Sequence, residues 1–333
     1  MKSLTFTIEK QLKHFGICDA SAAVPLGEDY FIVGNDEADE KLGNVLRVYA
    51  SHTSGPPIKI GSSEQTSIDI NGYFENNPKN KEIDLEAVSE LNGVIYWITS
   101  HGRNKKGKFK PERHQFFGTR ITQTDGSILE QVGKSYTQLV LRDMLEDSKL
   151  EILNFKEAET LAPKAKGGLC IEGLTATPEG ELLIGFRNPI PQGKALLVTL
   201  KNPHELANDP DTARAVFGDT IELDLGGLGI RSIEYWSSIE AYLIIAGPFD
   251  GGDEFALYSW SGNCQDNPKL VESLQFPEKF RPESVLFYPH LKDTFQILSD
   301  DGAVLRANGQ PCKDIQDKNH PEKYFQSIWV KVT

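Results

Sequence analysis

The sequence predicts an all-β fold, a five-bladed β-propeller, and three observations favour it. One hairpin plan recurs five times along the chain, each copy begins with a polar residue followed by a small residue, and each turn leads into an apolar run of β-formers. Additional strands lie between the copies at irregular spacing. Repeated antiparallel units of this kind are typical of propellers, and six blades are the alternative count.

The clearest copy spans Leu169 to Pro189, LCIEGLTATPEGELLIGFRNP. Its first strand opens at Glu172, and its second strand ends at Arg187 and Asn188. A Pro-Glu-Gly turn separates the strands, which is ordinary turn chemistry. The polar residues at the equivalent position of the five copies are Ser21, Glu86, Glu172, Arg231 and Glu283. The small residues that follow them are Ala22, Ala87, Gly173, Ser232 and Ser284.

The remaining elements follow in chain order. We expect a strand at 4–10, three more strands of blade one at 44–49, 58–60 and 67–70, a second blade over 83–132 with a strand at 114–122, and a helix at 136–147. Blade three continues to residue 225 with a short helical insertion near 203–207, blade four covers 226–274 with a strand at 256–260, and blade five begins at Phe280. The alternating segment 324–332 is expected to pair with the N-terminal strand and close the ring of a single domain, residues 1–333.

Composition excludes several partner classes. The chain of 333 residues has a net charge of −13, which disfavours binding of nucleic acid or an anionic membrane by the whole surface. It has no apolar run near 20 residues and no apolar signal-peptide core, so we expect a soluble, cytoplasmic protein. A protein partner is neither predicted nor excluded.

The four cysteines are Cys18, Cys170, Cys264 and Cys312, and none forms a CxxC pair. They are predicted to be buried thiols that act as small hydrophobic residues, with a disulfide or a metal site as the alternatives.

Hairpin geometry predicts where the polar residues meet. In an antiparallel hairpin the start of the first strand and the end of the second lie at the same edge. The five opening residues should therefore share one face with the residues that end each second strand. Candidates at those ends are Asp36, His101, Arg103, Asn104, Arg187, Asn188 and Asp300.

Three hypotheses account for such a ring. Ser21, Glu86, Glu172 and Glu283 could hold a hard cation such as Ca²⁺ through oxygen ligands. Arg231 could instead pair with the glutamates in an internal ion network, because its planar fork suits carboxylates. In the third hypothesis Glu86, Glu172 and His101 are catalytic, and Arg103, Asn104, Arg187, Asn188, Arg231, Asp36 and Asp300 bind the ligand.

The segment 101–114, HGRNKKGKFKPERH, reverses the acidic character of the chain with six lysines and arginines. It is either a solvated loop or a segment that captures an anion through Arg103 and Lys105. The sequence contains no P-loop, HExxH or GxSxG motif.

Several motifs resemble the bacterial domain-of-unknown-function family 3616: YWITSHGRNKKGK, IEGLTATPEGELLIGFRNP, IELDLGGLGIRSIEY and FRPESVLF. The resemblance implies a propeller fold, wider relatives among phytase-like esterases, and no settled activity. A more distant similarity to five-bladed calcium-dependent apyrases implies calcium ligands at Ser21, Glu86, Glu172 and Glu283. The chain departs from that pattern at Arg231, where an oxygen ligand would be needed.

The predicted function is binding, with hydrolysis as an extension, of an anionic, phosphorylated small molecule at the channel face. A non-catalytic structural or protein-interaction scaffold is the alternative. No cofactor is required by the sequence, and calcium is the one that the ring residues suggest.

Overall fold

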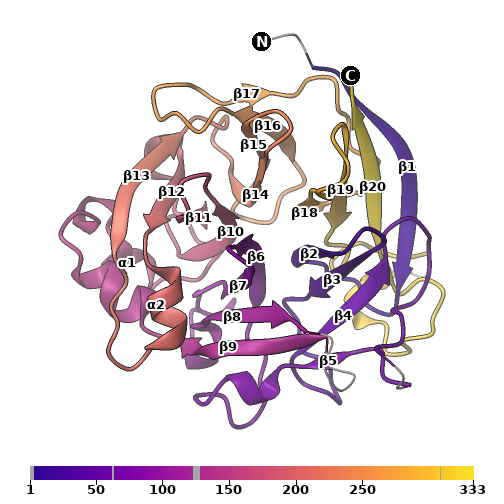
Figure 1. Cartoon of the computed structure of the whole chain (residues 1–333), viewed down its shortest axis with the longest axis horizontal. Coiled ribbons are helices and arrows are strands. Elements are labelled where there is room, and N and C mark those ends of the chain that lie inside the picture. The colour runs from indigo at the N-terminus through magenta and orange to yellow at the C-terminus, as the bar shows by residue number, and fades with distance from the viewer. Residues whose placement is uncertain (1–3, 62–63, 123–127, 308) are drawn as a thin grey trace.

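Five four-stranded antiparallel sheets lie around a central axis in the computed structural model, which describes residues 4–61, 64–122, 128–307 and 309–333 (Figure 1). The predicted five-bladed β-propeller is confirmed. Within each blade the strands are antiparallel neighbours, and the innermost strands β2, β6, β10, β14 and β18 contact one another around the axis.

The blades are built in chain order. Blade one contains β2 (Ala22–Leu26), β3 (Tyr30–Gly34), β4 (Val45–Ala50) and β5 (Ile68–Asp69), and blade two contains β6 (Leu85–Leu91), β7 (Val94–Thr99), β8 (Phe116–Ile121) and β9 (Leu129–Tyr136). Blade three contains β10 (Cys170–Ala176), β11 (Leu182–Asn188), β12 (Ala195–Leu200) and β13 (Phe217–Leu223), and blade four contains β14 (Gly229–Trp236), β15 (Ala241–Gly247), β16 (Ala256–Trp260) and β17 (Lys269–Leu270).

Both ends of the chain build blade five. Its order is β18 (Pro282–Leu286), β19 (Thr294–Ser299), β20 (Tyr324–Val332) and β1 (Phe6–Phe15), and β1 pairs antiparallel with β20 from Phe6–Val332 to Phe15–Tyr324. The predicted pairing of the two terminal segments is therefore confirmed. The ring is thus closed within one sheet, in which β1 from the start of the chain forms the outer edge.

The hydrophobic core is divided among the five blade interfaces. Each of five clusters of buried apolar residues joins two neighbouring blades. Phe116 and Phe117 illustrate the division, because adjacent residues of a strand point to opposite faces. Phe116 packs in the interface between blades two and three, Phe117 packs between blades one and two, and both are fully buried. Burial of each phenyl ring contributes about 2–3 kcal/mol.

Small and hydroxyl residues on the inner strands allow the blades to approach closely. The Ser284 hydroxyl donates to the carbonyl of Ser21 at 2.7 Å, which joins blades five and one. The Ala176 amide donates to the Ser89 hydroxyl at 2.9 Å, and the Tyr235 amide donates to the Thr175 hydroxyl at 3.1 Å. These bonds satisfy backbone groups that the blade sheets leave free.

Two predicted elements are corrected. Residues 136–147 do not form one regular helix, since β9 extends to Tyr136 and a π-helical segment spans Leu139–Met144. Its apolar side chains fill the interface between blades two and three, so packing rather than helical propensity determines this segment. Residues 58–60 are not a strand, although the Ile58 amide donates to the Val48 carbonyl at 2.8 Å.

The remaining helical segments are short. They are α1 (Phe155–Ala158), the predicted insertion α2 (Pro203–Asn208), and single 3-10 turns at Asn71–Tyr73, Pro111–Arg113, Glu151–Leu153, Pro191–Gly193 and Cys312–Asp314. In the part of the chain that the structure describes, no helix has the length and apolar character needed to cross a membrane.

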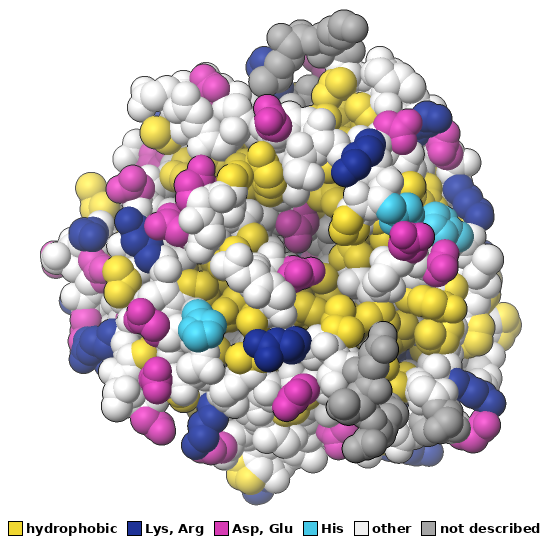
Figure 2. All heavy atoms as spheres, in the orientation of Figure 1, with side chains coloured by type: hydrophobic (Ala, Val, Ile, Leu, Met, Phe, Trp, Pro, Cys, Tyr) yellow, Lys and Arg dark blue, Asp and Glu magenta, His cyan; other side chains and the backbone are white. Residues whose placement is uncertain are grey.

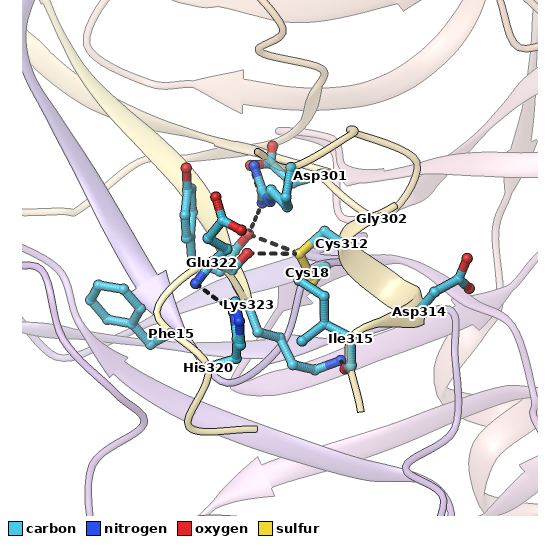
Figure 3. Close-up of a disulfide and its surroundings, with 12 residues drawn as sticks. Phe15, Cys18, Asp301, Gly302, Cys312, Asp314, Ile315, His320, Glu322 and Lys323 are labelled. Atoms are coloured by element: carbon cyan, nitrogen blue, oxygen red, sulfur yellow. Dashed lines mark hydrogen bonds and ion pairs between the residues drawn. A yellow bond between two sulfur atoms is a disulfide. The ribbon is translucent and has the colours of Figure 1, made fainter. Parts of the chain in front are cut away.

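The prediction that all cysteines are free thiols is wrong for one pair. Cys18 and Cys312 form a disulfide across 294 residues of sequence, and their Cα atoms lie 5.9 Å apart (Figure 3). Sequence spacing could not indicate this pair, because ring closure brings the two residues together. Cys170 is a buried thiol, as predicted, and Cys264 is an exposed thiol.

Candidate polar ring at the channel

The side chains that line the channel are turned toward the axis by β-bulges. Glu86, Glu172, Arg231 and Glu283 each fall at a register shift between the first and second strands of their blade. A bulge leaves one residue outside the ladder and re-aims its side chain. Ser21 directly precedes β2 and, like Glu86 and Glu172, lines the narrow channel. The expected convergence of the five opening residues is observed.

Arg231 lies at the centre of an ion network. Its Nη1 is 2.7 Å from Glu172 Oε2, and its Nε donates to Glu283 Oε2 at 3.2 Å. Arg187 pairs with the other oxygen of Glu172. All four side chains are at least 90% buried. This geometry favours the ion-network hypothesis, because each buried charge is matched by an opposite charge.

Glu86 differs from the other ring glutamates. It is 8% exposed, and no hydrogen bond or ion pair to its carboxyl group occurs in the described ranges. Burial raises its pKa well above the usual range, and the carboxyl groups of Glu172 and Asp84 add to the effect. Burial therefore favours the protonated form of this carboxyl group, in which it can act as a hydrogen-bond donor.

One group of ring residues has donor atoms close enough for a metal ion. Ligand atoms of Glu86, Cys170 and Glu172 lie within 4.8 Å of one another. The predicted calcium set, Ser21, Glu86, Glu172 and Glu283, fits less well, because the Arg231 guanidinium lies between Glu172 and Glu283. Calcium also requires six or more oxygen ligands, and sulfur is a poor one. These residues therefore do not fit calcium, and we derive no chemistry through it.

The basic loop is fixed by acidic partners. Arg103 donates from Nη2 to Glu159 Oε2 at 3.1 Å, and Arg113 pairs with Asp84 at 2.8 Å and with Glu82. Asn104 caps a turn through two backbone amides, those of Lys106 and Lys108. Lys105, proposed to capture an anion together with Arg103, is exposed at the loop surface.

Two other predicted site residues have structural contacts. Asn188 donates to the carbonyls of Pro163 and Ala165 and precedes a cis peptide bond to Pro189. The ring of His101 is buried against the edge of His114, with centroids 5.2 Å apart. Burial, with His114 nearby, lowers the pKa of His101 well below its usual range, so its imidazole is neutral.

A second group of carboxyl groups lies at the junction of blades one and five. Asp300 Oδ1 accepts from the Gly302 amide at 2.8 Å, and Asp36 Oδ1 is buried without a partner in the described ranges. Asp19, which is 7% exposed, contacts the same glycine, since a Cβ at Gly302 would overlap its Oδ1. Burial raises the pKa of Asp19 and of Asp36 well above the usual range, and Asp300 reinforces both shifts.

Sequence reasoning did not identify Asp19, Asp84 or Cys170 as site residues. Each lies two positions before the opening residue of its copy, which are Ser21, Glu86 and Glu172. This shared spacing of two residues could have identified all three as residues beside the ring. Period-two alternation places residues two apart on the same face of a strand, but the intervening bulge obscures this relation in the sequence.

Cavities lie beside the ring rather than within it. The channel itself holds about 10 Å³, room for about one water molecule. A cavity of about 460 Å³ lies between blades one and five and is lined by Cys18, Asp19, Arg47, Lys313 and Lys323 among others. Lys323 lies beside the Cys18–Cys312 disulfide (Figure 3). The predicted ligand residues Arg103, Arg187 and Arg231 do not line this cavity.

These features can be compared with known proteins. A family model described as a protein of unknown function (DUF3616) matches residues 131–282. The match runs from β9 to the start of β18 and supports the family resemblance that the motifs indicate, over slightly less than half of the chain. No curated protein sequence matches the chain.

Solved structures with a similar arrangement share little sequence with this chain. The PQQ-bound aldose sugar dehydrogenase of Streptomyces coelicolor is 10% identical with a TM-score of 0.48, covering 99% of this chain and 98% of that one. Glutaminyl cyclase of Myxococcus xanthus is 10% identical with a TM-score of 0.47, covering 99% and 97%. An exo-β-1,3-galactanase of Clostridium thermocellum is 9% identical with a TM-score of 0.47, covering 88% and 58%. At these values the likeness carries no statement about activity.

Proposed function

We propose that this propeller binds a small anionic molecule, such as a phosphate monoester, in the cavity between blades one and five on the channel face. Two cationic side chains of the cavity support the proposal, because each has at least one N–H group that is not paired with a carboxylate. Lys323 is half-buried, and its Nζ donates to the carbonyl of Ile315 at 2.6 Å without an ion pair in the described ranges. Arg47 pairs with Asp39 at 2.6 Å, and its buried Nη1 has no partner there.

The charge of the cavity is consistent with an anion. Five basic side chains line it, together with five acidic ones. Asp19 is one of the acids, and burial raises its pKa well above the usual range, with Asp36 and Asp300 adding to the shift. Protonation of Asp19 would leave the cavity with one unmatched positive charge. Charge-assisted hydrogen bonds to phosphate or carboxylate oxygens are about twice as strong as neutral ones.

Hydrolysis of a bound ester would require an acid for the leaving group. Asp19 is the candidate, because its carboxyl group lines the cavity and burial raises its pKa. In its protonated form it could donate a proton to the leaving oxygen as water attacks phosphorus or the acyl carbon, and then take up the proton that the attacking water releases. We therefore expect that Asp19→Asn removes turnover of phenyl phosphate or phenyl acetate, whose leaving group needs a proton, measured as released phenol, while anion binding persists.

The binding test is calorimetry and thermal melting at fixed ionic strength with inorganic phosphate, a phosphate monoester and a neutral alcohol of the same size. A bound ligand at a hundred times its Kd stabilises the fold by about 2.7 kcal/mol. We expect Lys323→Gln to weaken monoester binding about tenfold, corresponding to about 1.4 kcal/mol for one charged contact. Lys194→Gln, an exposed lysine of blade three, is the matched control.

The scaffold alternative has one observation in its favour. Arg231 is fully engaged with Glu172 and Glu283, as an internal network requires. Absence of any shift with all the anions, in a protein that melts cooperatively, would reject the binding proposal in favour of the scaffold.

A further inference from the structure

The opposite mouth of the channel is a second hollow, separate from the polar ring. It encloses about 650 Å³ and is lined by residues of all five blades at the ends where the inner hairpins turn. Figure 2 looks onto this face, where apolar side chains gather beside the centre and acidic side chains lie among them. The volume is within the range of small-molecule sites.

The walls of the hollow are apolar and partly aromatic. Val24, Ile121, Val285 and Phe287 contribute aliphatic and phenyl surface, and Tyr235 adds a second ring. Phe287 is held by stacking on Trp236, with centroids 5.0 Å apart. A rigid aromatic wall of this kind can contact either an alkyl chain or a cation.

The charge of the hollow has one sign. Glu28, Glu90 and Glu234 line it, and no lysine or arginine does so among the described residues. The His290 side chain also lines the hollow, and the Lys292 Nζ donates to the carbonyl of Pro289, another lining residue, at 3.1 Å.

Glu234 lies where the hollow meets the channel, since it lines both. Its Oε2 accepts from the Thr175 hydroxyl at 3.0 Å, and the backbone amide of Tyr235 also favours the carboxylate form. Burial raises its pKa to about 8, against the hydrogen bond from Thr175, while Glu90 adds to the rise. An arriving positive charge would favour the ionised form of this carboxyl group.

We infer that this hollow binds an organic amine, with its ammonium group on Glu234 and its apolar body against Tyr235, Phe287 and Val285. A hydrated metal ion fits poorly, because apolar walls would remove its water without supplying the six or more oxygens that a hard cation needs. An anion would gain no partner here, because Glu28, Glu90 and Glu234 line the hollow and no lysine or arginine does so among the described residues. The inference does not depend on the proposed anion site, which lies on the other face.

The test compares n-hexylammonium, hexanol and hexanoate by calorimetry at pH 7.5, with ammonium chloride as the control for charge alone. We expect hexylammonium to bind at least tenfold more tightly than hexanol, and no binding of hexanoate or ammonium. Glu234→Gln should reduce the preference for the amine over the alcohol about tenfold. Glu240→Gln, which alters an exposed glutamate of the same hairpin turn, should leave the preference unchanged.

Two further results complete the test. Phe287→Ala should weaken hexylammonium and hexanol alike, because it removes apolar wall and no charge. A phosphate monoester should not compete with the amine, which separates this site from the anion site. Equal binding of amine and alcohol, or an unchanged preference in a folded Glu234→Gln variant, would overturn the inference.

Discussion

Glu86 shows how strongly position controls the chemistry of a single residue. It occupies the same bulged position as Glu172 and Glu283, yet those two carboxylates pair with arginines and Glu86 does not. An unpaired carboxylate costs several kcal/mol when buried, so the group is stable there only with its proton. The fold therefore tolerates an acid at this position and opposes its ionised form.

A pH dependence of stability follows. The folded-state pKa of Glu86 is raised above the unfolded value near 4.5, so the native state binds more protons. Its stability therefore falls as the pH rises above about 4.5, until the carboxyl group of the folded protein ionises. Glu86→Gln mimics the protonated acid, and we expect it to flatten this decline by up to about 1.4 kcal/mol per pH unit. Urea unfolding at pH 5, 6.5 and 8 measures the effect, with exposed Glu130→Gln as the control. Parallel pH profiles for the wild type and Glu86→Gln would contradict it.

At the scale of elements, the inner strands depend on close backbone contact. β14 begins at Gly229, where a Cβ would lie 1.9 Å from the carbonyl oxygen of Arg187 at the end of β11. Backbone atoms cannot give way as a flexible side chain can. This glycine therefore sets the distance between blades three and four beside the ring.

We expect Gly229→Ala to destabilise the protein by about 3 kcal/mol, the upper end for overpacking, because the two strands must separate. Loss of the Arg187–Glu172 contact at the end of β11 should accompany it. Gly72→Ala is the control, since a Cβ there meets no atom within 4 Å, and it should change stability by less than about 0.5 kcal/mol. Equal urea midpoints for the two variants would refute the role given to Gly229.

Comparison of sequence and structure explains which features were predictable. The hairpin repeat predicted the blades and the position of the ring residues, because turn residues and apolar runs act locally. The sequence also indicated that Arg231 could pair with the ring glutamates, and Glu172 and Glu283 do so. Which glutamate stays unpaired was not predictable, because the bulges and the spacing of the inner strands determine whether Glu86 or Glu283 meets Arg231. The Cys18–Cys312 pair and the 460 Å³ cavity both arise only where the first and last blades meet.

At the scale of the whole molecule, that disulfide links blade one to blade five next to the strand that closes the ring. Such a cross-link lowers the entropy of the unfolded chain and typically contributes about 2–4 kcal/mol. It also bears on the expected cytoplasmic location, because disulfides persist mainly in oxidising compartments. The location stays a prediction.

Reduction should therefore loosen the closed ring. We expect dithiothreitol to lower the melting temperature of the wild type by several degrees. A variant carrying both Cys18→Ala and Cys312→Ala should melt at a lower temperature than the wild type without reductant. Dithiothreitol should not change the melting temperature of that variant. Cys264→Ser alters an exposed free thiol and should melt, and respond to reductant, as the wild type does. If the melting temperature of the wild type does not change after the disulfide is shown to be reduced, the disulfide does not stabilise the fold.

The joining of β1 to β20 also constrains the order of events on the ribosome. Residues 6–15 emerge before their neighbours in the sheet, residues 324–332, and all of the other strands are translated between the two segments. Four blades can assemble while the nascent chain grows. Residues 6–15 cannot form their strand pairing until residues 324–332 have been translated. An arrested translation product that stops before residue 324 would therefore display an open crescent with an unsatisfied strand, a natural target for chaperones.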